Sequence, residues 1–369
     1  MATAYRIRRV LVGLAAVSIT LLGSCTPSAA PASTAAPAAE SALSLPGEEA
    51  WHGGVSSLLF GINQSFDWAG SNLENTTAAQ QLLKQTGFTL IRTFFSEQHQ
   101  GWPVHKGPTT DGDLELRFQA IENSGAQCLG VLYVLDDPQF DSSLKFLDHV
   151  LTFAESSKPG VVRCRLWEYG NEYGNMTTYL KRWNHDIPYL RARHPEARFI
   201  GPVIAGPYVD QMQKFLDGVK ASGVLPDAVS YHDYPCYKSP DYLDTAADAA
   251  ACDAMINPQY ASTIAEFRGM ISTTLGKDVP LGITEWNVSP NFVNLVDGIR
   301  PLTVSPSYLP HFVREIYAAM SSGGLRFAAE YSAMCGCGVG SAGSLDLIDA
   351  NGMPQPWAVD YRSVITAAR

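Results

Sequence analysis

Two segments of the sequence each carry a glutamate near the end of an apolar run. Residues 165–172 read Arg-Leu-Trp-Glu-Tyr-Gly-Asn-Glu and end at Glu172, and residues 281–287 read Leu-Gly-Ile-Thr-Glu-Trp-Asn and contain Glu285. Two carboxyl groups at one opening can cleave a glycosidic bond, because one protonates the leaving oxygen while the other, ionised, attacks the sugar carbon or activates water. We expect burial and mutual repulsion to keep the acid protonated, and hydrogen bonds to keep its partner ionised.

The two segments belong to a regular alternation of strands and helices that starts near residue 58. Short apolar, β-branched or aromatic runs predict eight strands, and a stretch that can form a helix follows each of them. The predicted strands are 58–63, 90–96, 127–134, 163–172, 198–205, 228–234, 280–286 and 327–334. Eight such units predict an α/β fold of the (β/α)8 TIM barrel type over residues 51–369; an open doubly wound sheet is the alternative.

A barrel would bring the two glutamates together. Glu172 ends the fourth predicted strand and Glu285 lies at the end of the seventh. Barrel enzymes place their chemistry at the C-terminal ends of the strands, so we expect the two side chains to face each other across the barrel mouth. Their separation then predicts the stereochemistry, since retaining enzymes hold the pair about 5–5.5 Å apart and inverting enzymes about 6.5–9.5 Å.

The motifs at these strand ends resemble those of the retaining glycoside hydrolases of clan A. Enzymes of that clan share an Asn-Glu pair at the end of the fourth strand and a Glu at the end of the seventh. Here, Trp-Glu-x-x-Asn-Glu at 167–172 and Ile-Thr-Glu-Trp-Asn at 283–287 match that pattern, and they look most like glycoside hydrolase families 39 and 51. The resemblance extends by element order over the whole barrel.

This resemblance implies roles for individual residues. Glu172 would be the general acid/base and Glu285 the nucleophile that forms a glycosyl-enzyme ester. Asn171 would hydrogen-bond the sugar 2-hydroxyl, a contact that strengthens in the transition state. In such enzymes a Tyr or His on the sixth strand hydrogen-bonds the nucleophile and holds it ionised, and His232 and Tyr234 match that position.

Further side chains are candidates for lining the mouth. Arg92 on the second strand matches a basic residue found near the nucleophile in these enzymes. Glu168 should point the same way as Glu172, and we interpret it as a paired structural carboxylate rather than a catalyst. Aromatic faces stack on sugars and amides bind hydroxyls, although each of these residues could equally serve packing or end a strand. The remaining candidates for substrate contact are Trp167, Trp286, Tyr331 and Asn63.

Other catalytic motifs are missing or lack their context. The glycine-rich segment 338–343 fits a dinucleotide pattern, but no helix and second strand with a ribose-binding acid follow it, and we interpret it as a loop over the barrel mouth. The sequence contains no Gly-x-Ser-x-Gly elbow, no phosphate loop and no His-Glu-x-x-His motif. The predicted mechanism requires no metal and no cofactor.

The first fifty residues have the features of an export signal and a tether. Three arginines precede the apolar run 10–22, which is too short to span a bilayer, and 22–25 reads Leu-Gly-Ser-Cys, similar to a bacterial lipobox. Residues 1–24 would then be a lipoprotein signal peptide, and Cys25 would receive the lipid. Residues 25–50 are rich in Ala, Pro and Ser and are typical of a flexible tether.

These features predict an exported protein anchored through Cys25 to the outer face of a bacterial cell membrane. An ordinary signal peptide followed by a chance cysteine is the alternative, and the protein would then be secreted. The other six cysteines allow many pairings, among which Cys236 and Cys252, on either side of one loop, are the best disulfide candidate, whereas Cys335 and Cys337 stay unassigned.

The amino-acid composition narrows the classes of ligand that the protein could bind. Lys plus Arg is 26 and Asp plus Glu is 36, which gives a net charge of −10 and argues against nucleic acid as the ligand. The sequence therefore predicts a retaining glycoside hydrolase that acts on an extracellular polysaccharide or glycoconjugate. The alternatives are a glycan-binding lipoprotein without turnover, and a transglycosylase that uses the same covalent intermediate.

Overall fold

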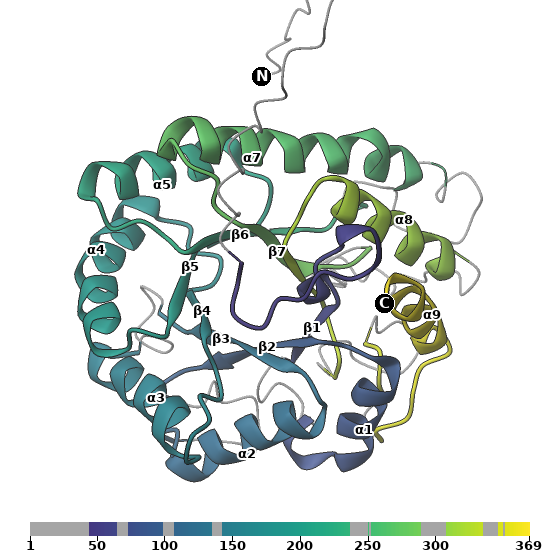
Figure 1. Ribbon diagram of the computed structural model, residues 1–369, viewed down its shortest axis with the longest axis horizontal. Coiled ribbons are helices and arrows are strands. Elements are labelled where there is room, and N and C mark those ends of the chain that lie inside the picture. The colour runs from purple at the N-terminus through teal and green to yellow at the C-terminus, as the bar shows by residue number, and fades with distance from the viewer. Residues whose placement is uncertain are drawn as a thin grey trace, which may run out of the picture. The chain divides into compact units, whose positions relative to one another are not determined.

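A computed structural model of the chain describes residues 44–64, 73–98, 107–134, 142–236, 250, 252–288, 308–334, 346–349 and 351–369. The predictions for the signal peptide, Cys25, Cys335, Cys337 and segment 338–343 lie outside these residues. Within them, eight parallel strands close into a barrel in sequence order, with the last strand paired to the first (Figure 1). The prediction of a (β/α)8 barrel is confirmed, and the open sheet is excluded.

The strands are short and, apart from the first residues of β3 and β5, buried, as expected of a parallel sheet covered on both sides. Their bounds are β1 (Gly61–Gln64), β2 (Leu90–Phe95), β3 (Gln127–Leu132), β4 (Leu166–Tyr169), β5 (Arg198–Ile204), β6 (Ala228–Asp233), β7 (Leu281–Trp286) and β8 (Phe327–Glu330).

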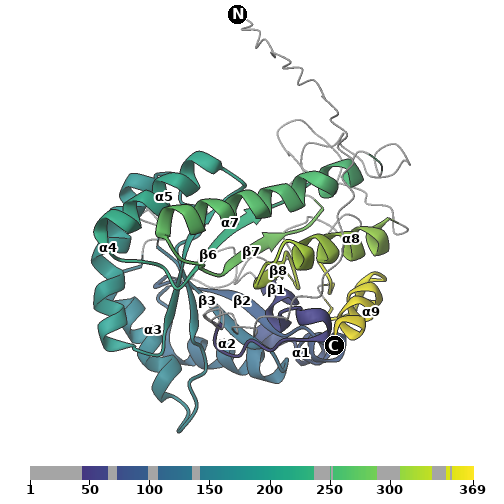
Figure 2. The ribbon, with the colours of Figure 1, turned by 45° about the horizontal axis from the view of Figure 1, so that its top comes forward.

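Helices surround the sheet; for example, α7 and α8 lie outside β6 and β7 (Figure 2). Their bounds are α1 (Thr77–Thr86), α2 (Asp111–Asn123), α3 (Leu144–Ser156), α4 (Met176–Arg193), α5 (Val209–Ser222), α7 (Ala261–Leu275), α8 (Leu309–Ser322) and α9 (Ala358–Ala368). None of the helices in the described ranges has the length and apolar character that a membrane span needs.

Local signals in the sequence set the helix ends. Helix α2 begins with a capping box, in which the Thr110 side chain accepts from the Asp113 backbone and the Asp113 side chain accepts from the Thr110 backbone. Helix α1 ends at Gly87, whose φ of 96° is open to glycine and strained for other residues. The connections from these helices to the next strands are short: residues 87–89 join α1 to β2, and residues 124–126 join α2 to β3.

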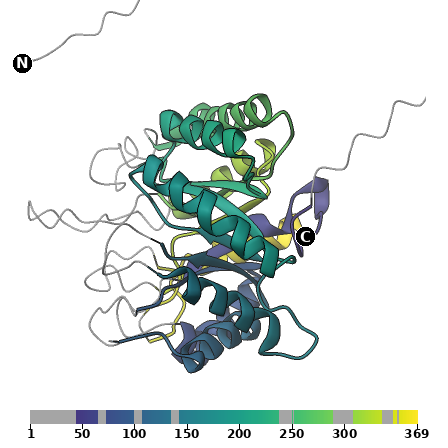
Figure 3. The same ribbon diagram turned by 90° about the vertical axis from the view of Figure 1, so that its left-hand side faces the viewer.

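An apolar plug closes the N-terminal end of the barrel. Side chains from six of the strands meet there, and Leu58 and Leu45 complete the cluster. Leu45 is only 4% exposed, and Glu48 forms an ion pair with Arg326 at 2.5 Å. Residues 44–59 therefore pack at this end of the barrel, beside the C-terminus (Figure 3). This corrects the predicted tether 25–50, whose last residues belong to the folded domain.

All eight strands are shorter than predicted, and for the first and the fourth the local cause is visible. The first begins at Gly61 because Ser57–Leu59 forms a 3₁₀ turn, in which the Ser56 side chain accepts from the Leu58 backbone. The fourth ends at Tyr169 because Gly170 and Glu172 both have positive φ, 81° and 53°, which a strand does not allow. The second difference places a catalytic candidate on a turn instead of a strand.

Two disulfides join described cysteines. Cys236 is bonded to Cys252, as expected for cysteines on either side of one loop. Cys128, in β3, is bonded to Cys164, just before β4, a pairing that the sequence left open. Both members of this second bond are only 4% exposed, so it fastens two neighbouring strands from within the core.

Removing the Cys128–Cys164 bond should destabilise the barrel. The bond closes a loop of 36 residues, and the loss of such a constraint on the unfolded chain corresponds to about 3–4 kcal/mol. We expect the double variant Cys128→Ala/Cys164→Ala to unfold at lower urea concentration than the wild type, with the same fold by circular dichroism. The matched variant Cys236→Ala/Cys252→Ala opens a loop of only 16 residues and should lose less. An unchanged urea midpoint in the first variant would contradict the prediction.

Candidate active site

Glu172 enters the barrel mouth on a strained turn. After β4 the chain reverses through Gly170, and Glu172 adopts a φ of 53°, which is uncommon outside glycine. Its backbone N–H donates to the carbonyl of Val203 at 2.8 Å, which ties the turn to the end of β5. Strain of this kind collects at functional sites, where the surrounding structure holds it in place. The result is a carboxyl group 39% open to solvent, directed into the mouth.

Glu285 reaches the mouth because β7 contains a bulge. Ile283 packs outward, between the strands and the helices, and strict alternation would send Glu285 the same way. The register shifts instead: Tyr231 pairs with Ile283, and the next residue, His232, pairs with Glu285. The additional residue, Thr284, turns Glu285 toward the barrel interior, as bulges next to active sites commonly do.

A histidine connects the two carboxyl groups. Nδ1 of His232 lies 2.8 Å from Oε1 of Glu172 and 3.4 Å from Oε2 of Glu285. All three atoms lie within 4.8 Å of one another. The two glutamates predicted from distant parts of the sequence therefore share one opening.

Arg92 lies beside this opening and contacts Glu285. Its guanidinium is fully buried, and its Nε donates to Oε2 of Glu168 at 2.5 Å. Nη1 donates to Asn63 Oδ1 and to Glu285 Oε1, both at 2.8 Å, and Nη2 donates to Asn171 Oδ1 at 2.7 Å. Arg92 thus lies beside the predicted nucleophile, in the position that the resemblance implied. Asn63 is also fully buried and contacts Arg92, so it fixes the arginine and does not reach a substrate.

Tyr234 gives Glu285 a second hydrogen-bond donor. Its hydroxyl donates to Oε2 of Glu285 at 3.1 Å, while Arg92 holds Oε1. Burial raises the pKa of Tyr234 well above its usual value, and the charge of Glu285 raises it further, so the phenol keeps its proton. A guanidinium and a hydroxyl therefore hold the two oxygens of Glu285 in a fixed orientation toward the opening.

The electrostatics of Glu172 differ from the expectation of a protonated acid. Burial raises the pKa of this carboxyl group, but the hydrogen bond from His232 and the charges of His232 and Arg92 outweigh burial and hold the pKa below its usual value. The physical reason is that His232 lies closer to Glu172 than to Glu285 and can donate to it. The resting site therefore favours a carboxylate at Glu172.

The two tryptophans do not belong to the mouth. Trp167 and Trp286 are at most 1% exposed and lie between the strands and the helices. Trp167 packs edge-on against Phe95, and Trp286 packs edge-on against Tyr317 of α8. This corrects their assignment as sugar platforms. The reason is alternation: each is adjacent to an inward-facing glutamate and so points to the opposite face of the sheet.

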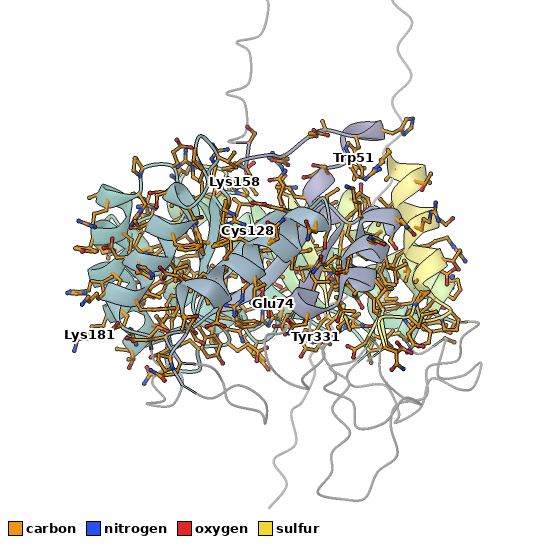
Figure 4. All side chains as sticks on the ribbon, turned by 90° about the horizontal axis from the view of Figure 1, so that it is seen from below. Trp51, Glu74, Cys128, Lys158, Lys181 and Tyr331 are labelled. Atoms are coloured by element: carbon orange, nitrogen blue, oxygen red, sulfur yellow. A yellow bond between two sulfur atoms is a disulfide. The ribbon has the colours of Figure 1, made fainter. Side chains whose placement is uncertain are left out.

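Tyr331 remains near the site. It follows β8, and its side chain is half-buried. It is close enough to Tyr234 to contribute to the raised pKa of that phenol. Figure 4 shows it at the opposite end of the barrel from Trp51, which packs with the N-terminal segment.

Two aromatic side chains at the mouth were not singled out from the sequence. Phe94 and Tyr133 form a small cluster with Val131 apart from the main core, and their rings meet edge-on with centroids 5.3 Å apart. Arg92 places its guanidinium carbon 5.1 Å from the centre of the Phe94 ring. Alternation along β2 could have found Phe94, because it lies two residues after Arg92 on the same face.

Comparison with known proteins identifies the fold. The sequence matches no protein-family model and no curated protein sequence. Solved structures do match, among them a monomeric β-xylosidase from Caulobacter crescentus, at 16% identity and a TM-score of 0.61 over 82% of this chain and 67% of that chain. A family 39 enzyme from Xanthomonas axonopodis pv. citri aligns at 14% identity and a TM-score of 0.61, over 84% of this chain and 67% of that chain.

A family 51 α-L-arabinofuranosidase from Bifidobacterium longum aligns at 13% identity and a TM-score of 0.59, over 84% of this chain and 73% of that chain. Identities this low show a common fold. The chain therefore has the barrel fold found in glycoside hydrolases of families 39 and 51.

Proposed function

We propose that the chain is a retaining glycoside hydrolase that cleaves O-glycosidic bonds through a covalent intermediate. One observation carries the proposal: an oxygen of Glu172 and an oxygen of Glu285 lie within 4.8 Å of each other at one opening. Oxygens this close fit carboxyl groups about 5–5.5 Å apart, as in retaining enzymes, better than the separation of about 6.5–9.5 Å in inverting enzymes. The fold likeness to glycoside hydrolases supports the same reading.

In the first step, a carboxylate oxygen of Glu285 attacks the anomeric carbon of the sugar. Glu172, protonated, gives its proton to the glycosidic oxygen, so the leaving group departs as an alcohol and the sugar is held as an ester of Glu285. Arg92 and Tyr234 prepare Glu285 for this attack, because they stabilise its ionised form.

In the second step, Glu172, now a carboxylate, takes a proton from water. The resulting hydroxyl attacks the anomeric carbon, the ester bond breaks, and Glu285 leaves as a carboxylate. Two inversions at one carbon restore its configuration. The hydrogen bond from His232 suits this step, because it stabilises the carboxylate that serves as the base.

The site also offers groups that can hold a sugar. Oδ1 of Asn171 accepts from Arg92, which directs the amide NH₂ of Asn171 away from the arginine and leaves it free to donate to a hydroxyl group. Phe94 and Tyr133 supply apolar ring surface beside Arg92, which suits the carbon–hydrogen face of a sugar ring. We infer a polysaccharide or glycoconjugate substrate from these contacts.

Product stereochemistry tests the proposal. A screen of chromogenic glycosides and cell-wall polysaccharides should find a substrate, and nuclear magnetic resonance of the first-formed sugar should show the anomeric configuration of the substrate. An inverted product would exclude the double displacement. Retained binding without hydrolysis of any substrate would favour the glycan-binding alternative, and sugar transfer to an added acceptor would favour the transglycosylase.

The dependence of activity on pH should reflect the resting charge of Glu172. Hydrolysis requires Glu172 protonated, and the pKa of this group is held below its usual value. We therefore expect kcat/KM to fall as pH rises through the acidic range, with an optimum well below neutrality. His232→Asn removes the hydrogen bond and the positive charge, so the pKa of Glu172 should rise and the basic limb should move to higher pH. A wild-type basic limb above neutrality that His232→Asn does not move would contradict this account.

We also propose that the protein is exported and held at the outer face of a bacterial membrane through Cys25. The signal-like segment supports export, and so do the two disulfides, since such bonds persist mainly in oxidising compartments. We expect Cys25→Ser to move the protein from the membrane fraction to the soluble exported fraction of the expressing cells, without changing kcat/KM. Equal partition of both forms would mean that Cys25 carries no anchor.

A further inference from the structure

Glu168 is a buried carboxylate that the proposed mechanism does not use. It lies on β4, two residues beyond Leu166 of the apolar plug, and its side chain is fully buried. Both of its oxygens are satisfied: Oε2 accepts from Nε of Arg92 at 2.5 Å, and Oε1 accepts from Oγ of Ser230 at 2.6 Å. A buried charge is strongly destabilising unless it is paired in this way. Even when it is paired, moving Glu168 out of water has a desolvation cost.

Because of this pairing, Glu168 and Glu285 share the positive charge of Arg92. Arg92 carries one positive charge, and two carboxylates contact it, Glu168 at 2.5 Å and Glu285 at 2.8 Å. Its other N–H groups donate to the amide oxygens of Asn63 and Asn171, and Nη2 also lies 3.5 Å from Nε2 of His232. Because Glu168 and Arg92 are fully buried, the charge of Glu168 acts on Glu285 with little screening.

The pairing also fixes where Arg92 points. A guanidinium is a rigid plane, so an anchor at Nε determines the directions of both Nη groups. With Nε held by Glu168, Nη1 meets Glu285 and Nη2 meets Asn171. The nucleophile and the amide that faces the sugar are thus oriented by one side chain, which is itself oriented by Glu168.

We propose that Glu168 is a positioning residue that acts through Arg92: it orients the guanidinium toward the nucleophile, and its negative charge sets the pH at which Glu285 becomes ionised. This inference rests on the proposed function, in which Glu285 attacks the sugar. Glu168 itself touches neither the sugar nor the reacting atoms.

Several other charged or titratable groups surround these two carboxylates. Around Glu285 they come from β2, from the turn after β4, and from β6 and the residue after it. Tyr179 of α4 lies within electrostatic reach of Glu168, and its pKa is raised well above the usual value by burial first and by the charges of Tyr169 and Glu168 next. The groups around Glu285 are Arg92, Glu172, His232 and Tyr234.

The variant Glu168→Gln removes the negative charge of this side chain but keeps its size and shape. The amide oxygen can still accept from Arg92, and the amide NH₂ can donate to Ser230, whose hydroxyl group can rotate to accept. With one negative charge removed, ionised Glu285 is better stabilised by Arg92, so a lower pH is needed to protonate it. We expect the acidic limb of kcat/KM to move down by about one pH unit, with the basic limb moving in the same direction.

Two further variants make the test specific. Ser230→Ala removes a hydrogen bond from Glu168 but no charge, so its acidic limb should stay at the wild-type pH. Glu168→Asp keeps the charge but withdraws the carboxylate from Arg92. It should leave the limb in place and lower kcat by at least about tenfold, since small misplacements of catalytic groups have effects of this size.

The outcomes distinguish a failure of the proposed function from a failure of the proposed role of Glu168. A wild-type protein without hydrolysis on any glycan refutes the proposed function. An active wild type whose acidic limb is unchanged in Glu168→Gln refutes the role of charge and leaves Glu168 as a structural residue. If Glu168→Gln does not fold, Glu168→Asp decides, because a wild-type kcat in that variant would refute the positioning role.

Discussion

Glu285→Gln should lower kcat/KM for glycoside hydrolysis by about 10⁴-fold or more, since it removes the attacking group while keeping the size of the side chain. The amide cannot form the glycosyl ester, and its NH₂ group replaces an oxygen that now accepts from Arg92 or Tyr234. The measurement is the initial rate on the best substrate of the screen, with glycan binding followed separately by calorimetry. Binding should persist, because Glu285 is only one of the polar groups at the mouth.

A companion variant shows that the lost group is the nucleophile. Glu285→Ala opens space at the anomeric carbon, and added azide can attack there in place of the carboxylate. A single displacement inverts that carbon, so the product should be a glycosyl azide of opposite configuration. The matched control Glu196→Gln alters an exposed glutamate, 56% open and paired with Arg165, and should behave as the wild type. Residual activity of Glu285→Gln above about one per cent would contradict the assignment.

The order of elements was predictable because parallel strands covered on both sides appear in sequence as short continuous apolar runs. The glutamate pair followed from the same reasoning, since the C-terminal ends of all strands of a barrel meet at one opening. Alternation applied more strictly would have corrected the assignment of Trp167, which is adjacent to the inward-facing Glu168 and therefore faces the helices.

Other features depend on contacts that no local pattern encodes. The bulge that turns Glu285 inward appears only in the register between β6 and β7, where His232 pairs two residues beyond the partner of Tyr231. The lowered pKa of Glu172 depends on which carboxyl group His232 approaches more closely, and a difference of 0.6 Å between 2.8 and 3.4 Å decides it. Sequence spacing predicts which residues meet, but it does not resolve distances of that size.

Glu172→Gln should slow hydrolysis by about 10²–10⁴-fold on substrates whose leaving group is an alcohol, because an alkoxide leaves poorly without a proton. The effect should depend on the leaving group. An activated aryl glycoside releases a stable phenolate without help, so its first step should proceed at nearly the wild-type rate. The second step still lacks its base, so the glycosyl ester of Glu285 should accumulate. A burst of phenolate equal to one enzyme equivalent, and a mass increase of one sugar on the peptide that contains Glu285, would measure this.

The dependence on the leaving group separates an acid/base from a residue that only binds or supports the site. Loss of a binding group would slow both kinds of substrate alike, whereas loss of the proton donor affects only the substrate that needs the proton. Azide added to Glu172→Gln should restore the second step, because this anion attacks the ester without a general base, and the glycosyl azide should keep the configuration of the substrate. That product is opposite to the one expected from Glu285→Ala. If both variants gave the same azide anomer, the assignment of the two glutamates to different roles would be wrong.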